Sequence, residues 1–269
     1  MYPLNEPITA IVRSLPATFA KALTQNPSAA PIDVELAQEQ HAVYVQGLKD
    51  IVRKVVVLPA DVNFPDCCFI EDTAVIVGNK AAISYLGAPS RRGEEKIIRV
   101  TLKECGLRTM LIEFPGTLDG GDVLFTGKHL IVGLSKRTNE FAARQLAEIF
   151  SEVPVVTVKV GDSLHLKSVM SAFDPEMLLF GDCDPARLIL QQLQEQNVIE
   201  GNYGLAFIPD PVSANVLNLG SSVFIQDGFP NSDAIFNELG ALKNKQIYKL
   251  SMSELIKADG ALTCCSLLF

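Results

Sequence analysis

The stretch TAVIVGNKAAIS (residues 73–84) consists of two short apolar runs with Gly78-Asn79 between them. β-Branched residues favour strands, and a glycine-containing pair between two such runs is typical of a β-hairpin. The stretch therefore predicts a small hairpin, and the recurrence of this pattern along the chain decides the fold.

Three further hairpins are predicted where two apolar runs surround Thr-Gly, Asp-Pro-Glu or Gly-Ser-Ser: residues 122–132, 168–180 and 215–226. Strand-like runs accompany them at residues 55–58, 110–114, 155–158, 205–208 and 246–250. These runs begin about 40 to 55 residues apart, a spacing at which internal structural repeats are expected. The chain therefore reads as repeats of one strand–hairpin–helix unit.

Helical periodicity appears between the hairpins, at residues 34–52, 139–150 and 185–196. Asp184-Pro185 suits the N-cap and the first position of the last of these helices. A fifth hairpin forms if residues 8–12 pair with residues 262–268. Five units closed in this way predict a single α/β domain, residues 1–269, arranged as a ring with few exposed sheet edges.

The alternatives are a doubly wound sheet and a generic α+β domain. Frequent hairpins, connections that look too short for repeated parallel crossovers and the absence of G-x-G-x-x-G argue against a doubly wound sheet. In a generic α+β domain, a spacing of about 45 residues would be a coincidence. We therefore prefer the ring of repeats.

The composition, with 48% hydrophobic and 20% charged residues, is that of a globular protein with a sizeable core. Its formal net charge of −8 does not favour nucleic-acid binding, which requires a positive face. The sequence has no long apolar run and no signal-peptide pattern, so neither a membrane span nor secretion is expected. Six cysteines without C-x-x-C spacing predict reduced thiols in a cytoplasmic protein.

Two adjacent cysteines, Cys264 and Cys265, lie in LTCCSLLF (residues 262–269). We expect this apolar run to be a buried strand, in which successive side chains point to opposite faces. One thiol would then face the core and the other a cavity, where it could act as a nucleophile. Strand alternation does not choose between the two.

A nucleophilic cysteine requires a histidine in contact with it, and the chain has three histidines. His41 lies among polar neighbours in a predicted helix, and His129 follows a Gly-Lys turn, so both are expected to face solvent. His165 lies between two leucines at the entry to a hairpin. It is the candidate for catalysis, and a structural role is equally compatible with its position.

Acidic residues cluster in NFPDCCFIED (residues 63–72) and in LDGGDVL (residues 118–124). The glycine pair after Asp119 allows close backbone approach to a ligand, and an ordinary tight turn is the alternative. Carboxylates facing one pocket would suit a guanidinium. Arg91 and Arg137 lie at equivalent positions, between a hairpin and a helix, from which they could clamp a carboxylate.

Six motifs together resemble the dimethylarginine dimethylaminohydrolase family. Each is weakly specific alone, but their order along nearly the whole chain is highly specific: PDCCFIED (65–72), GAPSRR (87–92), LDGGDVL (118–124), GLSKRTN (133–139), LHLKS (164–168) and DGALTCCS (259–266). The resemblance implies the five-bladed α/β propeller (pentein) fold of the guanidino-modifying enzymes, in agreement with the five predicted units.

The resemblance also implies a role for each candidate residue. Cys264 is implied as nucleophile, His165 as general acid/base and Asp119 as its acidic partner. The implied substrate contacts are Glu71 and Asp72 to the guanidinium, Asp66 and the carbonyls of Leu23 and Ala258 to the α-amino group, and Arg91 and Arg137 to the α-carboxylate.

The implied reaction converts dimethylated or monomethylated arginine to citrulline through a covalent thiouronium on Cys264, with no cofactor. Zinc captured by Cys264 and His165 would be inhibitory. The alternatives are an arginine deiminase, an amidinotransferase or a non-catalytic binding module built on the same propeller.

Overall fold

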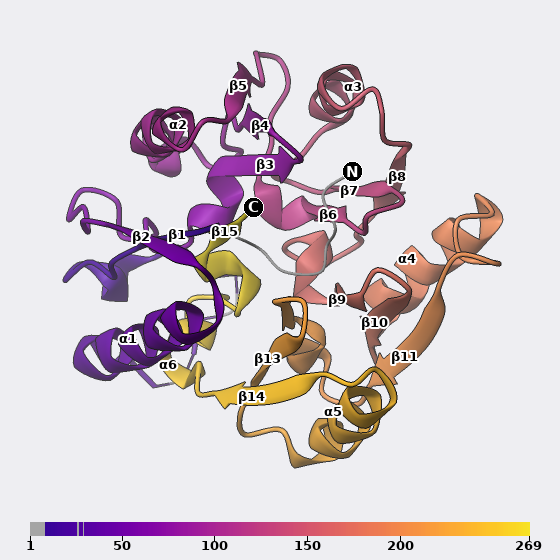
Figure 1. Ribbon diagram of the computed structural model, residues 1–269. Helices are drawn as coiled ribbons and strands as arrows, with labels where there is room; N and C mark the ends of the chain where they lie inside the picture. The colour runs from indigo at the N-terminus through magenta and orange to yellow at the C-terminus, as the bar shows by residue number, and fades with distance from the viewer. Residues whose placement is uncertain (1–8, 26, 29) are drawn as a thin grey trace.

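The computed structural model describes residues 9–25, 27–28 and 30–269, which form five three-stranded sheets around a common axis (Figure 1). In each sheet the inner strand pairs antiparallel with the middle strand, and the middle strand pairs in parallel with the outer strand. A helix on the periphery joins the middle strand to the outer strand. The predicted five-unit α/β architecture is confirmed.

Each unit contributes an inner strand, a middle strand, a helix and an outer strand, in that order. The units are β3 (Ala74–Val77), β4 (Lys80–Ile83), α2 (Glu95–Glu104) and β5 (Arg108–Leu111); β6 (Val123–Phe125), β7 (Leu130–Leu134), α3 (Glu140–Ile149) and β8 (Val155–Lys159); β9 (Met170–Asp174), β10 (Met177–Gly181), α4 (Asp184–Glu195) and β11 (Gly204–Ile208); β12 (Leu217–Asn218), β13 (Ser222–Gln226), α5 (Pro230–Leu242) and β14 (Gln246–Leu250); and β15 (Leu267–Leu268), β1 (Thr9–Arg13), α1 (Val34–Ile51) and β2 (Lys54–Leu58).

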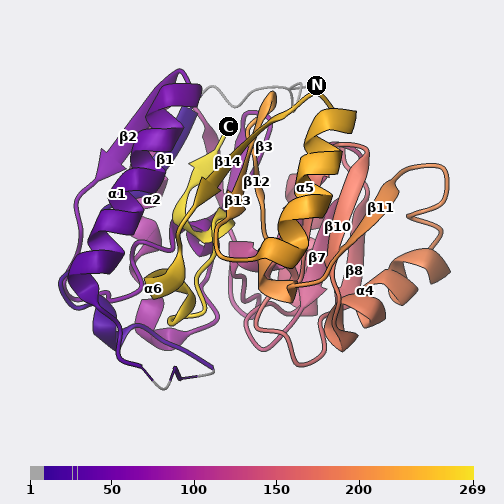
Figure 2. The ribbon, with the colours of Figure 1, turned by 90° about the horizontal axis from the view of Figure 1, so that it is seen from below.

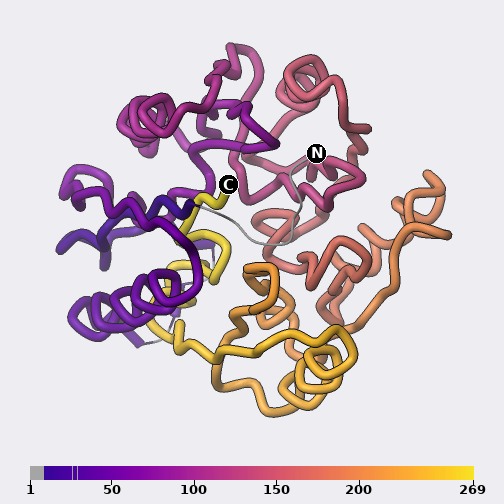
Figure 3. The backbone as a smooth tube through the Cα atoms, in the orientation of Figure 1, coloured from indigo at the N-terminus to yellow at the C-terminus, as the bar shows by residue number. Residues whose placement is uncertain are grey.

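The fifth unit joins the two ends of the described chain. Strand β15 pairs antiparallel with β1, and Thr9 and Phe269 exchange both backbone hydrogen bonds, at 2.8 and 3.0 Å. In Figure 3 the yellow end of the tube accordingly meets its indigo start. The predicted closure is confirmed, although Ile8 lies outside the described residues and residues 262–266 are not part of the strand.

Three sequence-based expectations were wrong in detail. The connections were expected to be too short for repeated parallel crossovers, but each unit contains one, with a helix between its two parallel strands. The strand predicted at residues 110–114 lies earlier in the chain, because β5 covers Arg108–Leu111. The N-cap of α4 is Cys183, which places Asp184 inside the helix.

The middle strands are buried, whereas most residues of the outer strands are half-buried or exposed. Apolar side chains pack between neighbouring sheets and beneath the helices. Figure 2, turned by 90°, shows helices α1 and α4 on opposite outer sides of the molecule. The additional short helix α6 (Ser253–Ile256) packs against α1. Within the described ranges, no helix is long and apolar enough to cross a membrane.

A short 3₁₀ turn precedes each inner strand, and neighbouring turns contact one another around the axis. We call these five segments the axial turns: Ile70–Thr73, Gly120–Asp122, Leu166–Ser168, Pro211–Ala214 and Thr263–Cys265. Because they converge, residues far apart in sequence meet at the centre of the ring.

Candidate active site

The axial turns bring four buried carboxylates together: Glu71, Asp72, Asp119 and Asp122. Backbone N–H groups stabilise three of them, since Gly121 donates to Asp72 at 2.9 Å, Gly87 to Asp119 at 2.9 Å and Leu166 to Asp122 at 3.0 Å. A buried carboxylate requires such partners to keep its charge. Even so, burial raises the pKa of Asp122 to about 6, against the opposing effect of His165.

His165, the residue directly before the third axial turn, lies among these carboxylates. Its Nε2 is 3.2 Å from Asp119 Oδ2, and its Nδ1 is 4.0 Å from Asp72 Oδ1. Burial opposes its protonation, but Asp72, Asp122 and Asp119 outweigh burial and raise the pKa of the imidazole to about 9. The side chain is therefore an imidazolium at neutral pH, as a general acid requires.

The glycine pair after Asp119 is needed for close packing. A Cβ on Gly121 would lie 2.7 Å from His165 Nδ1 and 2.9 Å from Asp72 Oδ1. Real Cβ atoms essentially never approach so closely. Because Gly121 has no side chain, its backbone can lie against the His165 imidazole and donate a hydrogen bond to the Asp72 carboxylate.

The two cysteines lie on a 3₁₀ turn, Thr263–Cys265, and the expectation of a strand was wrong. The turn nevertheless separates the thiols, because Cys265 is fully buried in the core whereas Cys264 is partly exposed. Burial raises the pKa of Cys264, and the carboxylates of Glu71 and Asp72 raise it further. The Cys264 thiol thus lies in a negative environment and is protonated in the free protein.

Glu71 joins the cysteine turn to the histidine turn. One carboxylate oxygen accepts from Lys167 Nζ at 2.6 Å, and the other accepts from Thr263 Oγ1 at 2.8 Å. Burial raises the pKa of Glu71, while the Lys167 ammonium lowers it. Lys167 and Thr263 were not among the residues predicted for the site. Their closeness in sequence to His165 and Cys264, within one or two residues, was the available signal.

Arg91 is buried, and most of its guanidinium N–H groups donate to other residues of the protein. Its Nη1 lies 2.5 Å from Asp72, its Nη2 donates to the Phe69 carbonyl at 2.8 Å, and its Nε and Nη2 bind Glu94. A guanidinium has five N–H donors, so one N–H on Nη1 remains for another ligand. Arg137 is more open and lies 3.5 Å from Asp119 Oδ2.

Asp66 is buried beside the segment that contains Leu23. The Leu23 N–H donates to Asp66 at 3.0 Å, and burial raises the pKa of Asp66 against the effects of Arg91 and this hydrogen bond. Ala258, two residues after α6, is also buried. Its neighbour Asp259 accepts a hydrogen bond from the backbone of Gln25, which draws the two segments together.

One combination of described residues could hold a metal ion. Asp72, Asp119 and His165 offer ligand atoms within 4.8 Å of one another. Both carboxylates already pair with cationic groups, and the imidazole is itself protonated. A metal would have to compete with these protons and cations.

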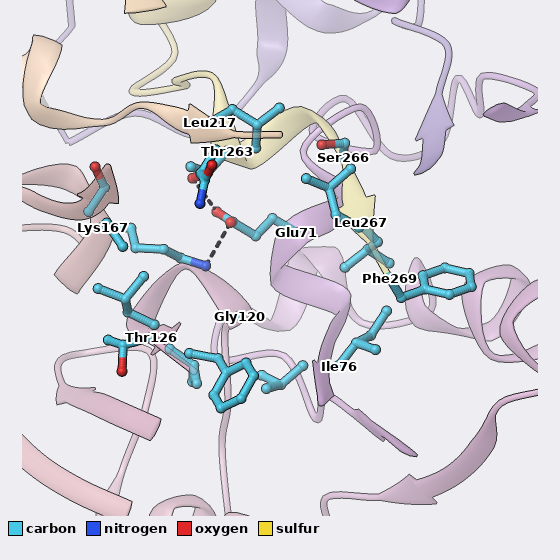
Figure 4. A pocket seen from close by; sticks show the side chains of 18 of the residues that line it. Glu71, Ile76, Gly120, Thr126, Lys167, Leu217, Thr263, Ser266, Leu267 and Phe269 are labelled. Atoms are coloured by element: carbon cyan, nitrogen blue, oxygen red, sulfur yellow. Dashed lines mark hydrogen bonds and ion pairs between the residues drawn. The ribbon is translucent and has the colours of Figure 1, made fainter. Parts of the chain in front are cut away.

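A cavity of about 270 Å³ opens along the axis between the inner strands. Figure 4 looks into it, with Glu71, Lys167 and Thr263 on its wall. Cys264, His165 and Asp119 are not among its lining residues. Glu71, Lys167 and Thr263 thus belong both to the wall of this cavity and to a hydrogen-bonded group, in which Thr263 and Lys167 lie close in sequence to Cys264 and His165.

Comparison with known proteins identifies close relatives. The model of the family "N,N dimethylarginine dimethylhydrolase, eukaryotic" matches residues 17–183. The N(G),N(G)-dimethylarginine dimethylaminohydrolase of Pseudomonas aeruginosa is 31% identical over 264 residues, which cover 96% of this chain and 98% of the relative.

Solved structures agree with this relationship. A cysteine-to-serine mutant of the Pseudomonas aeruginosa enzyme, complexed with citrulline, has a TM-score of 0.88 and 28% identity, with 98% of this chain and 100% of that chain covered. The N-terminal domain of a cyanobacterial arginine dihydrolase has a TM-score of 0.81, 20% identity and coverage of 97% of both chains, so it shares the fold.

Proposed function

Because the chain belongs to the dimethylarginine dimethylaminohydrolase family, we propose that it hydrolyses Nω,Nω-dimethyl-L-arginine to L-citrulline and dimethylamine, and the monomethylated compound to citrulline and methylamine. The observation that carries the proposal is the position of Cys264. It lies against two buried carboxylates, on a ring that also holds a protonated histidine.

Substrate binding is proposed to use the surplus of negative charge at the axis. The carboxylates of Glu71 and Asp72 each accept one hydrogen bond per oxygen from the protein, and an ionised carboxylate oxygen can accept a second. Both can therefore bind the planar guanidinium. Asp66, with the carbonyls of Leu23 and Ala258, binds the α-amino group. Arg137 binds the α-carboxylate together with the remaining N–H of Arg91.

Activation of the thiol follows from the same charges. The carboxylates that raise the pKa of Cys264 are those that face the guanidinium, so a bound cation compensates their charge and lowers the pKa. The substrate thus helps to generate the thiolate that attacks it. Without substrate the nucleophile stays protonated and less reactive.

In the first chemical step, Cys264 releases its proton to solvent, and the resulting thiolate forms a C–S bond with the guanidino carbon. His165 gives its proton to the dimethylated nitrogen while the C–N bond breaks, and dimethylamine leaves. Asp119, bonded to the imidazole at 3.2 Å, holds the ring in position. A thiouronium remains on Cys264.

In the second step, His165 accepts a proton from water, and the resulting hydroxide adds to the thiouronium carbon. As the C–S bond breaks, the hydroxyl group on the carbon gives up its proton to the departing sulfur, which restores the Cys264 thiol and releases citrulline. The imidazolium is restored for the next cycle, so one histidine serves as acid and then as base.

The test is citrulline release from asymmetric dimethylarginine and from arginine by wild type, Cys264→Ser and Cys265→Ser. We expect turnover of the methylated substrate, little turnover of arginine, none in Cys264→Ser and retained turnover in Cys265→Ser. Full activity of Cys264→Ser would contradict the assignment of Cys264 as the nucleophile. Preference for arginine would favour a deiminase, and complete inactivity of the wild type a binding module.

Inhibitory zinc at Cys264 and His165 belongs to the same proposal. Thiolate and imidazole are zinc ligands, and zinc must displace the protons of both groups. Micromolar zinc is expected to inhibit wild type, EDTA to restore activity, and inhibition to weaken at lower pH. Equal zinc binding by wild type and Cys264→Ser, measured by calorimetry, would contradict this site.

A further inference from the structure

Asn215 is a buried amide that the reaction above does not use. It directly follows the axial turn Pro211–Ala214 and is 1% exposed. Its Nδ2 lies 2.8 Å from the Lys167 carbonyl oxygen and 3.0 Å from Thr263 Oγ1, and its Oδ1 lies 3.0 Å from the Thr263 backbone nitrogen. The side chain therefore bridges two other axial turns.

Hydrogen-bonding chemistry fixes the orientation of this amide. The Thr263 N–H can only donate and the Lys167 carbonyl can only accept, so each must face the matching end of the Asn215 side chain. The Thr263 hydroxyl accepts from Asn215 and has a single proton, which it donates to Glu71. Lys167 donates to the other oxygen of Glu71, which closes a loop of hydrogen bonds. Figure 4 shows the Glu71 part of this loop.

The loop joins the two segments that carry the chemistry. Lys167 follows His165 by two residues, and Thr263 directly precedes Cys264. We propose that Asn215 is a positioning residue that fixes the Cys264 thiol relative to the His165 imidazole. Its catalytic consequence rests on the proposed function, whereas its effect on the reactivity of Cys264 does not.

Substitution of the amide tests the proposal. Asn215→Leu has a similar size and removes all three hydrogen bonds. Because misplacement of reacting groups by about 1 Å can cost about 100-fold, we expect kcat to fall by about 10- to 100-fold. KM should change by less than about threefold, since Asn215 contacts none of the proposed substrate-binding side chains.

Thr263 offers an independent variant of the same link. Thr263→Val removes the hydroxyl at nearly constant shape, and Thr263→Ser keeps it. Thr263→Val should lower kcat and Thr263→Ser should restore it. The double variant Asn215→Leu/Thr263→Val should cost little more than Asn215→Leu alone, because both changes interrupt one connection.

Gln226 supplies the matched control. It is a fully buried amide of the same unit, and its Nε2 donates to the Val212 carbonyl at 2.6 Å. Gln226→Leu should lower stability, because it removes this hydrogen bond and leaves the Val212 carbonyl with only the longer one from the Asn215 N–H, at 3.4 Å. It should not alter kcat, since Gln226 lies outside the loop of hydrogen bonds.

Two readouts separate positioning from loss of folded protein. The first is kcat per reactive Cys264, and the second is the pH dependence of the rate at which iodoacetamide alkylates Cys264, followed by mass spectrometry of its peptide without substrate. Both should differ from wild type in Asn215→Leu and match wild type in Gln226→Leu. If both are unchanged in Asn215→Leu, the proposal is overturned.

The two proposals can fail separately. A wild type that releases no citrulline contradicts the proposed function, while the alkylation rates still decide the role of Asn215. If Asn215→Leu does not fold, the comparison of Thr263→Val with Thr263→Ser decides it. Equal kcat and equal alkylation in that pair overturn the positioning role.

Discussion

At the scale of single residues, His165 shows how the axial carboxylates set a charge. Its pKa in the folded protein is about 9, above the ordinary 6.5, so the folded state holds this proton more tightly than the unfolded state. The resulting stabilisation, on the order of 3 kcal/mol, is fully present below pH 6.5 and is lost as pH rises towards 9. His165→Gln should therefore remove a decline in the free energy of unfolding, measured by urea denaturation between pH 6.5 and 9.

His129→Gln is the control for this pH dependence. His129 is half-buried, its Nδ1 pairs with the Tyr203 hydroxyl, and burial lowers its pKa. Because its pKa is lowered, its titration does not destabilise the folded state as pH rises from 6.5 to 9, so its variant should keep the decline seen in wild type. Parallel stability curves for wild type and His165→Gln would show that the carboxylates do not hold the proton as described.

Gly121 gives a second prediction at this scale. A methyl group there would displace His165 and Asp72, which it would approach at 2.7 and 2.9 Å. Gly121→Ala should lower kcat by about 10-fold or more through misplacement of the imidazole. Gly106→Ala is the control: Gly106 has a φ of +89° and open space around it, so stability should fall while kcat stays the same. Equal kcat in both variants would contradict the packing argument.

At the scale of elements, helix α1 supports the cysteine turn from outside. Tyr44 is fully buried on α1, and its hydroxyl donates to the Leu262 carbonyl at 2.9 Å and pairs with Ser266 Oγ at 2.7 Å. These partners flank the turn Thr263–Cys265 on both sides. Tyr44→Phe should cost about 1 to 3 kcal/mol of stability and also lower kcat several-fold.

The matched variant is Tyr203→Phe. The Tyr203 hydroxyl also has two partners, Thr126 Oγ1 and His129 Nδ1, each at 2.6 Å, but these lie away from the cysteine turn. Thermal unfolding and steady-state kinetics should show a comparable stability loss in both variants, with reduced kcat only in Tyr44→Phe. A loss of kcat in both would mean that stability alone explains the effect.

Elements held by local chemistry could be predicted from the sequence. The hairpin β3–β4 formed as expected, because its apolar runs and the positive φ of Gly78 suffice to specify it. The cysteine turn could not be predicted, since the Thr263 N–H is bonded by Asn215 from another unit. His41 was expected to face solvent, but it is buried and burial lowers its pKa to about 4.

The candidate site was predictable to the same extent: residues in distinctive local motifs could be identified, and contacts made by distant segments could not. The motifs identified most of the charged residues, because each contains an unusual group of acids, arginines or glycines. Their pairing depended on the packing of the axial turns, which no local pattern contains. Glu94, which binds Arg91, and Asn215 were therefore missed.

At the scale of the whole molecule, closure of the ring links the first described strand to the turn that carries Cys264, the proposed nucleophile. Ile11 on β1 is fully buried and pairs with Leu267, two residues after Cys265. Ile11→Ala should cost about 2 to 5 kcal/mol of stability. Beyond this global loss, it should loosen β15 and the adjacent cysteine turn, because that strand has β1 as its partner in the sheet.

Ile131→Ala provides the comparison, since Ile131 is equally buried on the middle strand β7 of another unit. Native-state hydrogen exchange reports local opening separately from global unfolding. Amides of residues 263–269 should exchange faster in Ile11→Ala than its global stability accounts for, whereas in Ile131→Ala they should follow the global value. Iodoacetamide should accordingly reach Cys264 faster in Ile11→Ala. The same exchange pattern in both variants would mean that the ring opens as a whole. Strand β1 would then not specifically stabilise the turn that carries Cys264.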